Sequence, residues 1–137
     1  MKKLKIVVVG YGNVGKFTVE AVKASPDMEL AGVVRRVESL KKKPAELSDI
    51  KVVSDIEDLG KVDVAILCGP SRSVPELAPK YLEKGIYTVD CFDIHTDIFD
   101  LHEKLGEIAR NNKVAAVTAA GCKNAYDGYG TKRTDLY

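Results

Sequence analysis

Residues 5–15 read KIVVVGYGNVG and place a run of mostly β-branched residues directly before a glycine-rich turn. A continuous apolar run that stops at Gly10 is typical of a strand buried on both faces of a parallel sheet. From Asn13 to Ala24 apolar residues recur at roughly helical spacing, and Ser25-Pro26 ends this run because proline disfavours helix in the residue before it. The segment therefore predicts a strand, a tight turn and a helix.

The same alternation continues through most of the chain. Further strands are predicted at Glu29–Val34, Lys51–Val53, Val62–Cys68, Ile86–Asp90 and Val114–Ala119. Further helices are predicted from Val74 or Pro75 to Gly85 and at Asp97–Asn111, and the lysine-rich connection Glu38–Asp49 is expected to be a loop or an irregular helix. The alternation predicts an α/β fold of the NAD(P)-binding Rossmann type. Its doubly wound parallel sheet would have about six strands, in an order such as 3-2-1-4-5-6.

Length and composition limit the possible classes of function. A chain of 137 residues with 45% hydrophobic and 30% charged residues fits one globular domain and excludes a disordered chain. Lys plus Arg is 21 against 20 for Asp plus Glu, so no overall field attracts nucleic acid or an anionic membrane. The apolar run at the N-terminus stops after Val9, too short for a signal peptide or a spanning helix. We expect a soluble cytoplasmic protein.

The cysteines and histidines do not form a metal-ligand pattern. Cys68, Cys91 and Cys122 are an odd set without CxxC spacing, and the two histidines complete no ligand group. We therefore expect neither a zinc site nor a disulfide framework.

The turn Gly10-Tyr11-Gly12-Asn13-Val14-Gly15 is a GxGxxG sequence between a predicted strand and a predicted helix. Gly10 permits the tight turn, Gly12 lets a pyrophosphate approach the backbone, and Gly15 allows close packing of the helix on the strand. The free N–H groups of the helix N-terminus would face the phosphates. The alternative is a glycine-rich turn that binds nothing, or that binds a nucleotide other than a dinucleotide.

Two arginines follow the second predicted strand. In NAD-binding domains an acidic residue near this place accepts the ribose 2′-hydroxyl, but here the position is held by Arg35-Arg36. Guanidinium groups bind a 2′-phosphate through charge-assisted, bidentate hydrogen bonds and stack on adenine, whereas a carboxylate would repel that phosphate. The pair predicts NADP(H) rather than NAD(H), unless both arginines are simply a solvated strand end.

The loops after the fourth and fifth predicted strands belong to the ligand-binding edge of such a sheet. The first of them, Cys68 to Ser73, is small and polar, and its serines could alternatively cap the next helix. We interpret Cys68 as a small buried residue rather than a reactive thiol. The second loop, Asp90 to Asp97, holds three carboxylates and a histidine. Asp97 is predicted to be the N-cap of the next helix, and His95 to be structural.

The chain resembles one known family, the meso-diaminopimelate dehydrogenases, in their N-terminal dinucleotide-binding domain. The resemblance covers about Lys3 to Gly121 and is carried by VVVGYGNVGKF, PDMELAGVVRR, ILCGPSRSVPE and TVDCFDIHTDI. It implies reversible, NADP⁺-dependent oxidative deamination at the D-configured centre of meso-2,6-diaminopimelate, a small amino-acid substrate in bacterial lysine biosynthesis.

The resemblance also implies roles for individual residues. The pyrophosphate would be held by Tyr11, Gly12, Asn13 and Val14, and the 2′-phosphate by Arg35 and Arg36. The nicotinamide side would be formed by Gly69, Pro70, Ser71, Arg72, Phe92, Asp93 and Ile94. Asp93 would also be the catalytic carboxylate, nearest to the reacting amine. We include Gly10, Gly15, Cys68 and Gly121 in the predicted set of cofactor-binding residues.

The end of the sequence departs from the family. Where the family continues its -AG with WDPG and then a substrate and dimerisation domain, Ala120-Gly121 is followed here by Cys122-Lys123-Asn124. We interpret residues 1–121 as the dinucleotide-binding domain and residues 122–137 as an irregular tail. The chain alone is expected to bind cofactor but to produce no more than trace turnover, since half of the pocket is absent. The alternative is a free-standing, catalytically silent NADP-binding module or regulator. The family suggests a homodimer, whose interface lies largely in the absent domain.

Overall fold

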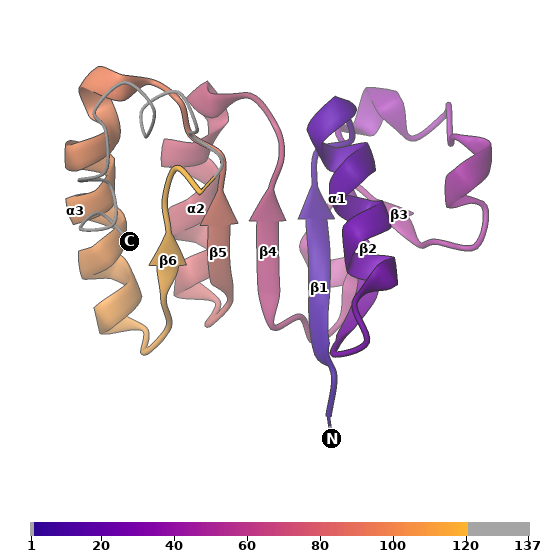
Figure 1. Ribbon diagram of the computed structural model, residues 1–137, viewed down its shortest axis with the longest axis horizontal. Coiled ribbons are helices and arrows are strands. Elements are labelled where there is room, and N and C mark those ends of the chain that lie inside the picture. The colour runs from indigo at the N-terminus through magenta and orange to yellow at the C-terminus, as the bar shows by residue number, and fades with distance from the viewer. Residues whose placement is uncertain (1, 121–137) are drawn as a thin grey trace. The chain divides into compact units, whose positions relative to one another are not determined.

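A computed structural model describes residues 2–120 of the chain (Figure 1). These residues fall into two compact units that meet in sequence after Gly69, residues 2–69 and 70–120. Gly121 and the predicted tail, residues 122–137, lie outside the described residues.

The first unit is a parallel sheet with one long helix. Its strands are β1 (Leu4–Val9), β2 (Met28–Val34), β3 (Val52–Val53) and β4 (Val64–Leu67), and its helix is α1 (Asn13–Ala24). The strands pair in the order β3-β2-β1-β4, as predicted. The connection between β2 and β3 contains two short 3₁₀ segments, Val37–Ser39 and Ala45–Leu47, and a third, Ile56–Leu59, precedes β4. The expectation of an irregular connection is therefore confirmed.

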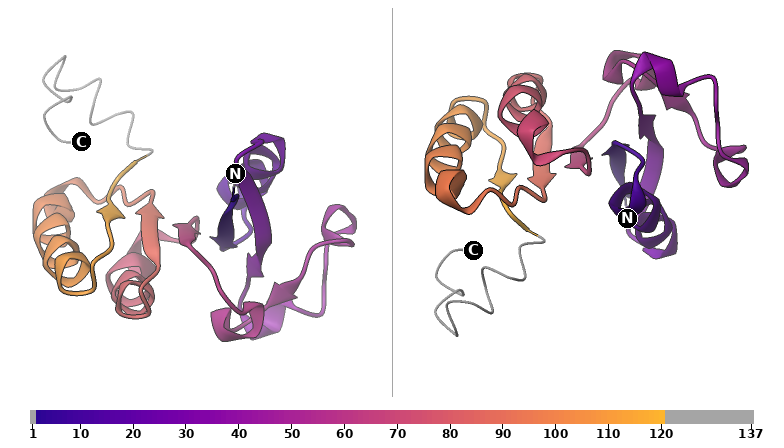
Figure 2. Two further views of the ribbon diagram at one scale, coloured as in Figure 1. Left: turned by 90° about the horizontal axis from the view of Figure 1, so that it is seen from below. Right: turned by 90° about the horizontal axis from the view of Figure 1, so that it is seen from above.

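The central position of β1 explains its continuous apolar sequence. It is hydrogen-bonded to β2 on one side and to β4 on the other, and Figure 2 shows α1 covering one side of β1 and β2. Val7 and Val8 are completely buried, and Val8 packs in a core cluster with Val19 of α1 and Val33 of β2. A strand enclosed in this way has no face left for polar residues.

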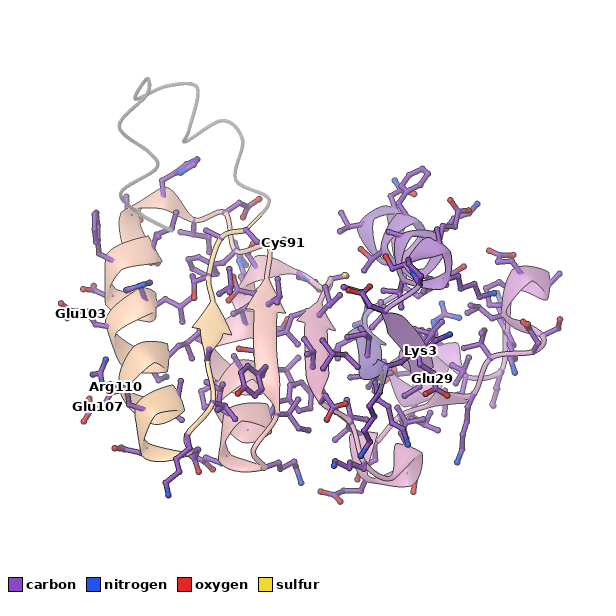
Figure 3. All side chains as sticks on the ribbon, turned by 60° about the horizontal axis from the view of Figure 1, so that its bottom comes forward. Lys3, Glu29, Cys91, Glu103, Glu107 and Arg110 are labelled. Carbon is purple, nitrogen blue, oxygen red and sulfur yellow. The ribbon has the colours of Figure 1, made fainter. Side chains whose placement is uncertain are left out.

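The second unit consists of two paired strands and two helices. It contains α2 (Val74–Glu83), β5 (Tyr87–Asp90), α3 (Ile98–Asn111) and β6 (Ala116–Val117), with 3₁₀ segments at Ser71–Ser73 and His95–Asp97. β5 and β6 are parallel, α2 packs against β5 and α3, and α3 packs against β6. Helix α3 buries Leu101, Leu105 and Ala109. Figure 3 shows Glu103, Glu107 and Arg110 on its opposite, outward face.

Helix α2 contains a proline that the sequence analysis did not single out, Pro79. Because proline has no N–H, the carbonyl of Pro75, four residues earlier, lacks its helical donor. The Nζ of Lys104 in α3 donates to that carbonyl at 3.3 Å. The contact satisfies the carbonyl and links the two helices.

All the predicted helices and strands are present, but some are shorter than predicted. The strand expected at Val114–Ala119 is only Ala116–Val117. The Val114 N–H donates to the Ala109 carbonyl and closes the end of α3, and Ala119 has a φ of +60°, which is incompatible with extended backbone. Helix α2 ends just before Gly85, whose φ of +79° is typical of the glycine that terminates a helix. Within residues 2–120, no helix is long and apolar enough to cross a membrane.

Helix α1 leaves part of its apolar surface uncovered. Val14 and Phe17 are exposed, and together with Ala21, Met28 and Ile66 they line a shallow hollow. The apolar stripe of α1 is therefore wider than the surface that packs on its own unit.

Two glycines that lie within helices, Gly15 of α1 and Gly106 of α3, provide a matched test of how closely the start of α1 packs against the glycine turn. A Cβ at Gly15 would lie 2.1 Å from the carbonyl oxygen of Gly10, whereas a Cβ at Gly106 of α3 would meet only the Arg110 guanidinium at 3.5 Å. Gly15→Ala should lower the free energy of unfolding by about 2 kcal/mol or more, because backbone must move. Gly106→Ala should raise it by up to about 1 kcal/mol, because alanine is the better helix former. Urea unfolding measures both; equal effects would contradict the close approach at Gly15.

Candidate functional site

The three glycines of the turn serve different purposes. Gly10 has a φ of +96°, and a Cβ there would lie 2.8 Å from the amide nitrogen of Gly69. Gly15 fits directly against Gly10, so both glycines are required by the packing of the chain itself. A Cβ at Gly12, in contrast, would have no atom of this structure within 4 Å. Packing among residues 2–120 therefore does not explain Gly12, and these residues leave the space beside it open.

The N-terminus of α1 is free to interact with an anion. Gly12 is its N-cap, no side chain among residues 2–120 caps it, and its first turn has no acidic residue. Asn13 and Val14 are exposed. The first N–H groups of a helix lack intrahelical acceptors and carry a partial positive charge. The turn therefore presents donors where the sequence predicts the pyrophosphate.

Arg35 lies next to the glycine turn, held at three points. Its N–H donates to the carbonyl of Val53 at 2.8 Å, and its Nη1 donates to the carbonyl of Lys42 at 3.1 Å. Its guanidinium carbon lies 5.6 Å from the centre of the Tyr11 ring, a cation–π distance. Arg36 is exposed. The structure thus brings together two residues of the predicted cofactor-binding set, Tyr11 and Arg35.

The far end of the Tyr11 ring contacts a residue that the sequence analysis missed, Glu46. The Tyr11 hydroxyl donates to Glu46 Oε1 at 3.0 Å. Burial and the neighbouring carboxylate raise the pKa of Tyr11. Hydrogen bonds from its own backbone N–H and from Tyr11 lower the pKa of Glu46. Glu46 is therefore a carboxylate at neutral pH, held by the tyrosine that Arg35 contacts.

Cys68 belongs to the core, as predicted. Its side chain is buried in the cluster that contains Val8 and Val19, and its Sγ lies 3.5 Å from the Thr18 hydroxyl as a donor. Its N–H donates to the carbonyl of Val9 at 2.7 Å. The next residue, Gly69, forms the wall against which Gly10 packs. Because the Cys68 side chain is buried and Gly69 has none, Cys68 and Gly69 could contact the predicted cofactor only through their backbone atoms.

In the second unit Ser71 and Asp93 form a two-point contact. The Ser71 hydroxyl donates to Asp93 Oδ1 at 2.5 Å and accepts the Asp93 N–H at 3.1 Å. This closed pair fixes both the carboxylate and its backbone. Among the described residues no donor is bonded to Asp93 Oδ2, which is left to accept a hydrogen bond from a ligand. Pro70 and Arg72 flank Ser71 and are exposed.

A buried carboxylate anchors the loop that carries Asp93. Asp90 is completely buried, and its Oδ1 accepts the N–H groups of Phe92 at 3.0 Å and Ala119 at 2.9 Å. Burial raises the pKa of Asp90 despite these two backbone hydrogen bonds, which act in the opposite direction. The Phe92 ring is only 1% exposed, so its side chain belongs to the core and Ile94 is the half-buried apolar neighbour of Asp93.

The prediction that Asp97 caps α3 is correct in position and wrong in contact. Asp97 is the N-cap residue, but its carboxylate caps no helix amide and instead accepts from the Thr96 hydroxyl at 3.3 Å. The preceding 3₁₀ turn, His95–Asp97, gives Asp97 a φ of −108° and a ψ of 0°, outside the extended conformation that capping side chains need. Similarly, Ser73 precedes α2 but donates to the carbonyl of Pro70 at 2.7 Å. Among residues 2–120, no group of three or more His, Cys, Asp or Glu side chains could hold a metal ion.

Comparison of this sequence with known protein families supports the same fold. Residues 4–91 match the model of an oxidoreductase family with an NAD-binding Rossmann fold. The chain belongs to this family. The predicted fold class is thereby confirmed.

The relatives include several meso-diaminopimelate D-dehydrogenases. That of Bacteroides fragilis is 52% identical over 121 residues, which are 88% of this chain and 40% of the relative. That of Corynebacterium glutamicum is 32% identical over 126 residues, which are 88% of this chain and 37% of the relative. The chain therefore spans at most 40% of the length of these two relatives, and it resembles their dinucleotide-binding domain.

Solved structures give the same result. An engineered D-amino acid dehydrogenase bound to NADP⁺ superposes with a TM-score of 0.74 at 28% identity, covering 93% of this chain and 40% of that one. The diaminopimelate dehydrogenase of C. glutamicum in complex with diaminopimelate superposes with a TM-score of 0.70 at 32% identity, covering 88% and 37%. The resemblance stated from the sequence is confirmed.

Asp90 offers a test of how the loop after β5 is held. Asp90→Ala should lower the free energy of unfolding by about 2 kcal/mol or more, because two buried N–H groups lose their acceptor. Asp90→Asn keeps an acceptor oxygen and removes the titration. Because the folded pKa is raised above the ordinary value of 3.8, the folded state binds this proton more tightly than the unfolded state does. Wild-type stability should therefore fall as the pH rises from about 3.8 through the folded pKa.

Urea unfolding between about pH 3 and pH 8 measures this dependence. In Asp90→Asn that part of the pH dependence should disappear, and near neutral pH this variant should be at least as stable as the wild type. An asparagine variant as unstable as the alanine variant at all pH values would contradict the account.

Proposed function

We propose that the chain is the NADP(H)-binding domain of an oxidoreductase of the meso-diaminopimelate dehydrogenase type. The observation that carries the proposal is the pair Arg35 and Arg36, directly after β2 and beside a glycine turn in which Gly12 meets no other part of the structure. The reaction proposed for the whole protein is oxidative deamination of the D-configured carbon of meso-2,6-diaminopimelate. The homodimer and the cytoplasmic location expected from the family are part of the same proposal.

The pyrophosphate is assigned to the N-terminus of α1, at the N–H groups of Gly12, Asn13 and Val14. Anions are stabilised there by the helix dipole and by N–H groups that have no intrahelical acceptor. The first turn of α1 has no acidic residue to oppose them. Tyr11 and the close pair Gly10 and Gly15 set the path of the backbone into this turn.

The adenosine 2′-phosphate is assigned to Arg35 and Arg36. An NAD-specific site would place a carboxylate at the end of β2, and here β2 ends at Val34 with two guanidinium groups after it. Arg35 is already oriented by Tyr11 and by the Lys42 carbonyl, so its binding conformation costs little additional entropy. The related engineered D-amino acid dehydrogenase structure contains NADP⁺, which supports the same choice.

The residues that follow β4 and β5 are assigned to the nicotinamide and the substrate amine. From the first unit, Gly69 and the backbone of Cys68 would line the nicotinamide side, and from the second unit Pro70, Ser71, Arg72, Ile94 and the backbone of Phe92. The side chains of Cys68 and Phe92 are buried. NADP⁺, when bound there, would supply the acceptor for a hydride from the substrate carbon. The imine left by this transfer would take up water and release ammonia as the ketone forms. Asp93 would orient the substrate ammonium by a charge-assisted bond to Oδ2 and receive a proton as the imine forms.

The choice of cofactor is tested by fluorescence titration of NADPH and NADH. The charge-assisted bonds of Arg35 and Arg36 to the 2′-phosphate should make NADPH bind at least about tenfold more tightly than NADH. Changing both arginines to alanine should abolish the difference. Lys2→Ala with Lys3→Ala removes the same charge from the start of the first unit, where Figure 3 shows Lys3, and should preserve the preference. Equal affinities in the wild type would contradict the assignment to NADP(H).

A further inference from the structure

A carboxylate contacts the tyrosine whose ring lies under Arg35, one of the two arginines assigned to the 2′-phosphate. Glu46 Oε1 accepts the Tyr11 hydroxyl at 3.0 Å, and Arg35 lies over the same ring at 5.6 Å from its centre. Tyr11 thus contacts a guanidinium over its ring and a carboxylate at its hydroxyl. The positive charge of Arg35 favours the proposed binding of a phosphate, whereas the negative charge of Glu46 opposes it.

The position of Glu46 is fixed by the packing of its own segment. Glu46 lies in the 3₁₀ segment Ala45–Leu47, and the next residue, Leu47, is completely buried in the cluster with Val8 and Val33. Two neighbouring contacts hold the same region: Arg35 donates to the Lys42 carbonyl, and the Leu47 N–H donates to the Pro44 carbonyl at 3.0 Å. Although exposed, Glu46 therefore has a backbone anchored in the core and a side chain held by Tyr11.

The electrostatic effect of Glu46 on a bound phosphate is repulsive. Its lowered pKa keeps it ionised at neutral pH, and Lys16 is the cation that contributes to this lowering. A phosphate monoester carries a charge of about −1.5 to −2 at pH 7. AMP and NAD(H) have only a hydroxyl at the ribose 2′ position and would not meet this repulsion there. A carboxylate can even accept a hydrogen bond from that hydroxyl.

We propose that Glu46 is a specificity-determining residue, which weakens the preference for 2′-phosphorylated adenosine that Arg35 and Arg36 create. The inference rests on the proposed NADP(H) function and assigns to the site a residue that the family motifs do not include. The balance between two arginines and one carboxylate then sets the ratio of affinities for the two types of cofactor.

The test uses the adenosine half of the cofactor alone. Adenosine 2′,5′-bisphosphate and AMP differ by the 2′-phosphate, and calorimetric titration gives the dissociation constant of each for the full chain. Glu46→Gln keeps the oxygen that accepts from Tyr11 and removes the charge. It should tighten binding of the bisphosphate by about threefold to tenfold, with AMP changed by less than about twofold, and the gain should shrink in high salt.

Two control variants isolate the effect of the charge at this position. Glu46→Asp keeps the charge and should stay within about twofold of the wild type for both ligands. Glu29→Gln removes the same charge from β2 near its start, where Figure 3 shows the side chain, whereas Arg35 follows the end of that strand. It should change neither affinity.

The outcomes separate this inference from the proposed function. An unchanged affinity ratio in Glu46→Gln, or an equal gain in Glu46→Asp or Glu29→Gln, overturns the role of Glu46. A wild-type chain that binds neither ligand contradicts the proposed function itself. A wild type that prefers the bisphosphate, with a stronger preference only in Glu46→Gln, supports both.

Discussion

The close approach of three glycine backbones determines the geometry of the first unit. Gly10 packs against Gly69 and Gly15 packs against Gly10, at distances where any Cβ would overlap with backbone atoms. This contact places the start of α1 directly against the ends of β1 and β4. The position of the N–H groups at the start of α1 depends on it. The path of the glycine turn is thus a consequence of backbone packing, whereas contacts among residues 2–120 do not account for Gly12.

Buried side chains hold two of the loops that carry the proposed ligand residues. Leu47, packed against Val8, fixes the segment that presents Glu46. Asp90 fixes the loop that presents Asp93 by binding two backbone N–H groups in a fully buried position. The exposed residues are thereby held in place before a ligand binds, which lowers the entropy cost of ordering them. The raised pKa of Asp90 is a consequence of this role, since its carboxyl is removed from water.

The sequence predicted what depends on local pattern and missed what depends on distant residues. The β1 run, the glycine turn and α1 were predictable because hydrophobic spacing and glycine positions report directly on backbone conformation. The pairs Tyr11 with Glu46, Ser71 with Asp93, and Asp90 with Ala119 are separated by 35, 22 and 29 residues. No local pattern reveals such contacts, because they depend on how the loops are folded over the sheet edge. The capping role of Asp97 failed for a related reason: capping requires an extended backbone that the 3₁₀ turn does not provide.

The assignment of the cofactor phosphates to the glycine turn, which we propose above, can be tested by NMR. The ¹⁵N-labelled chain is titrated with NADP⁺ and its amide chemical shifts are followed. Saturable shifts should be largest at Gly12, Asn13, Val14 and Arg35. They should be absent in Gly12→Val, whose Cβ would meet no other atom of this structure and whose spectrum should otherwise be preserved. Saturable shifts confined to other residues, with the amides of the glycine turn unchanged, would contradict the claim.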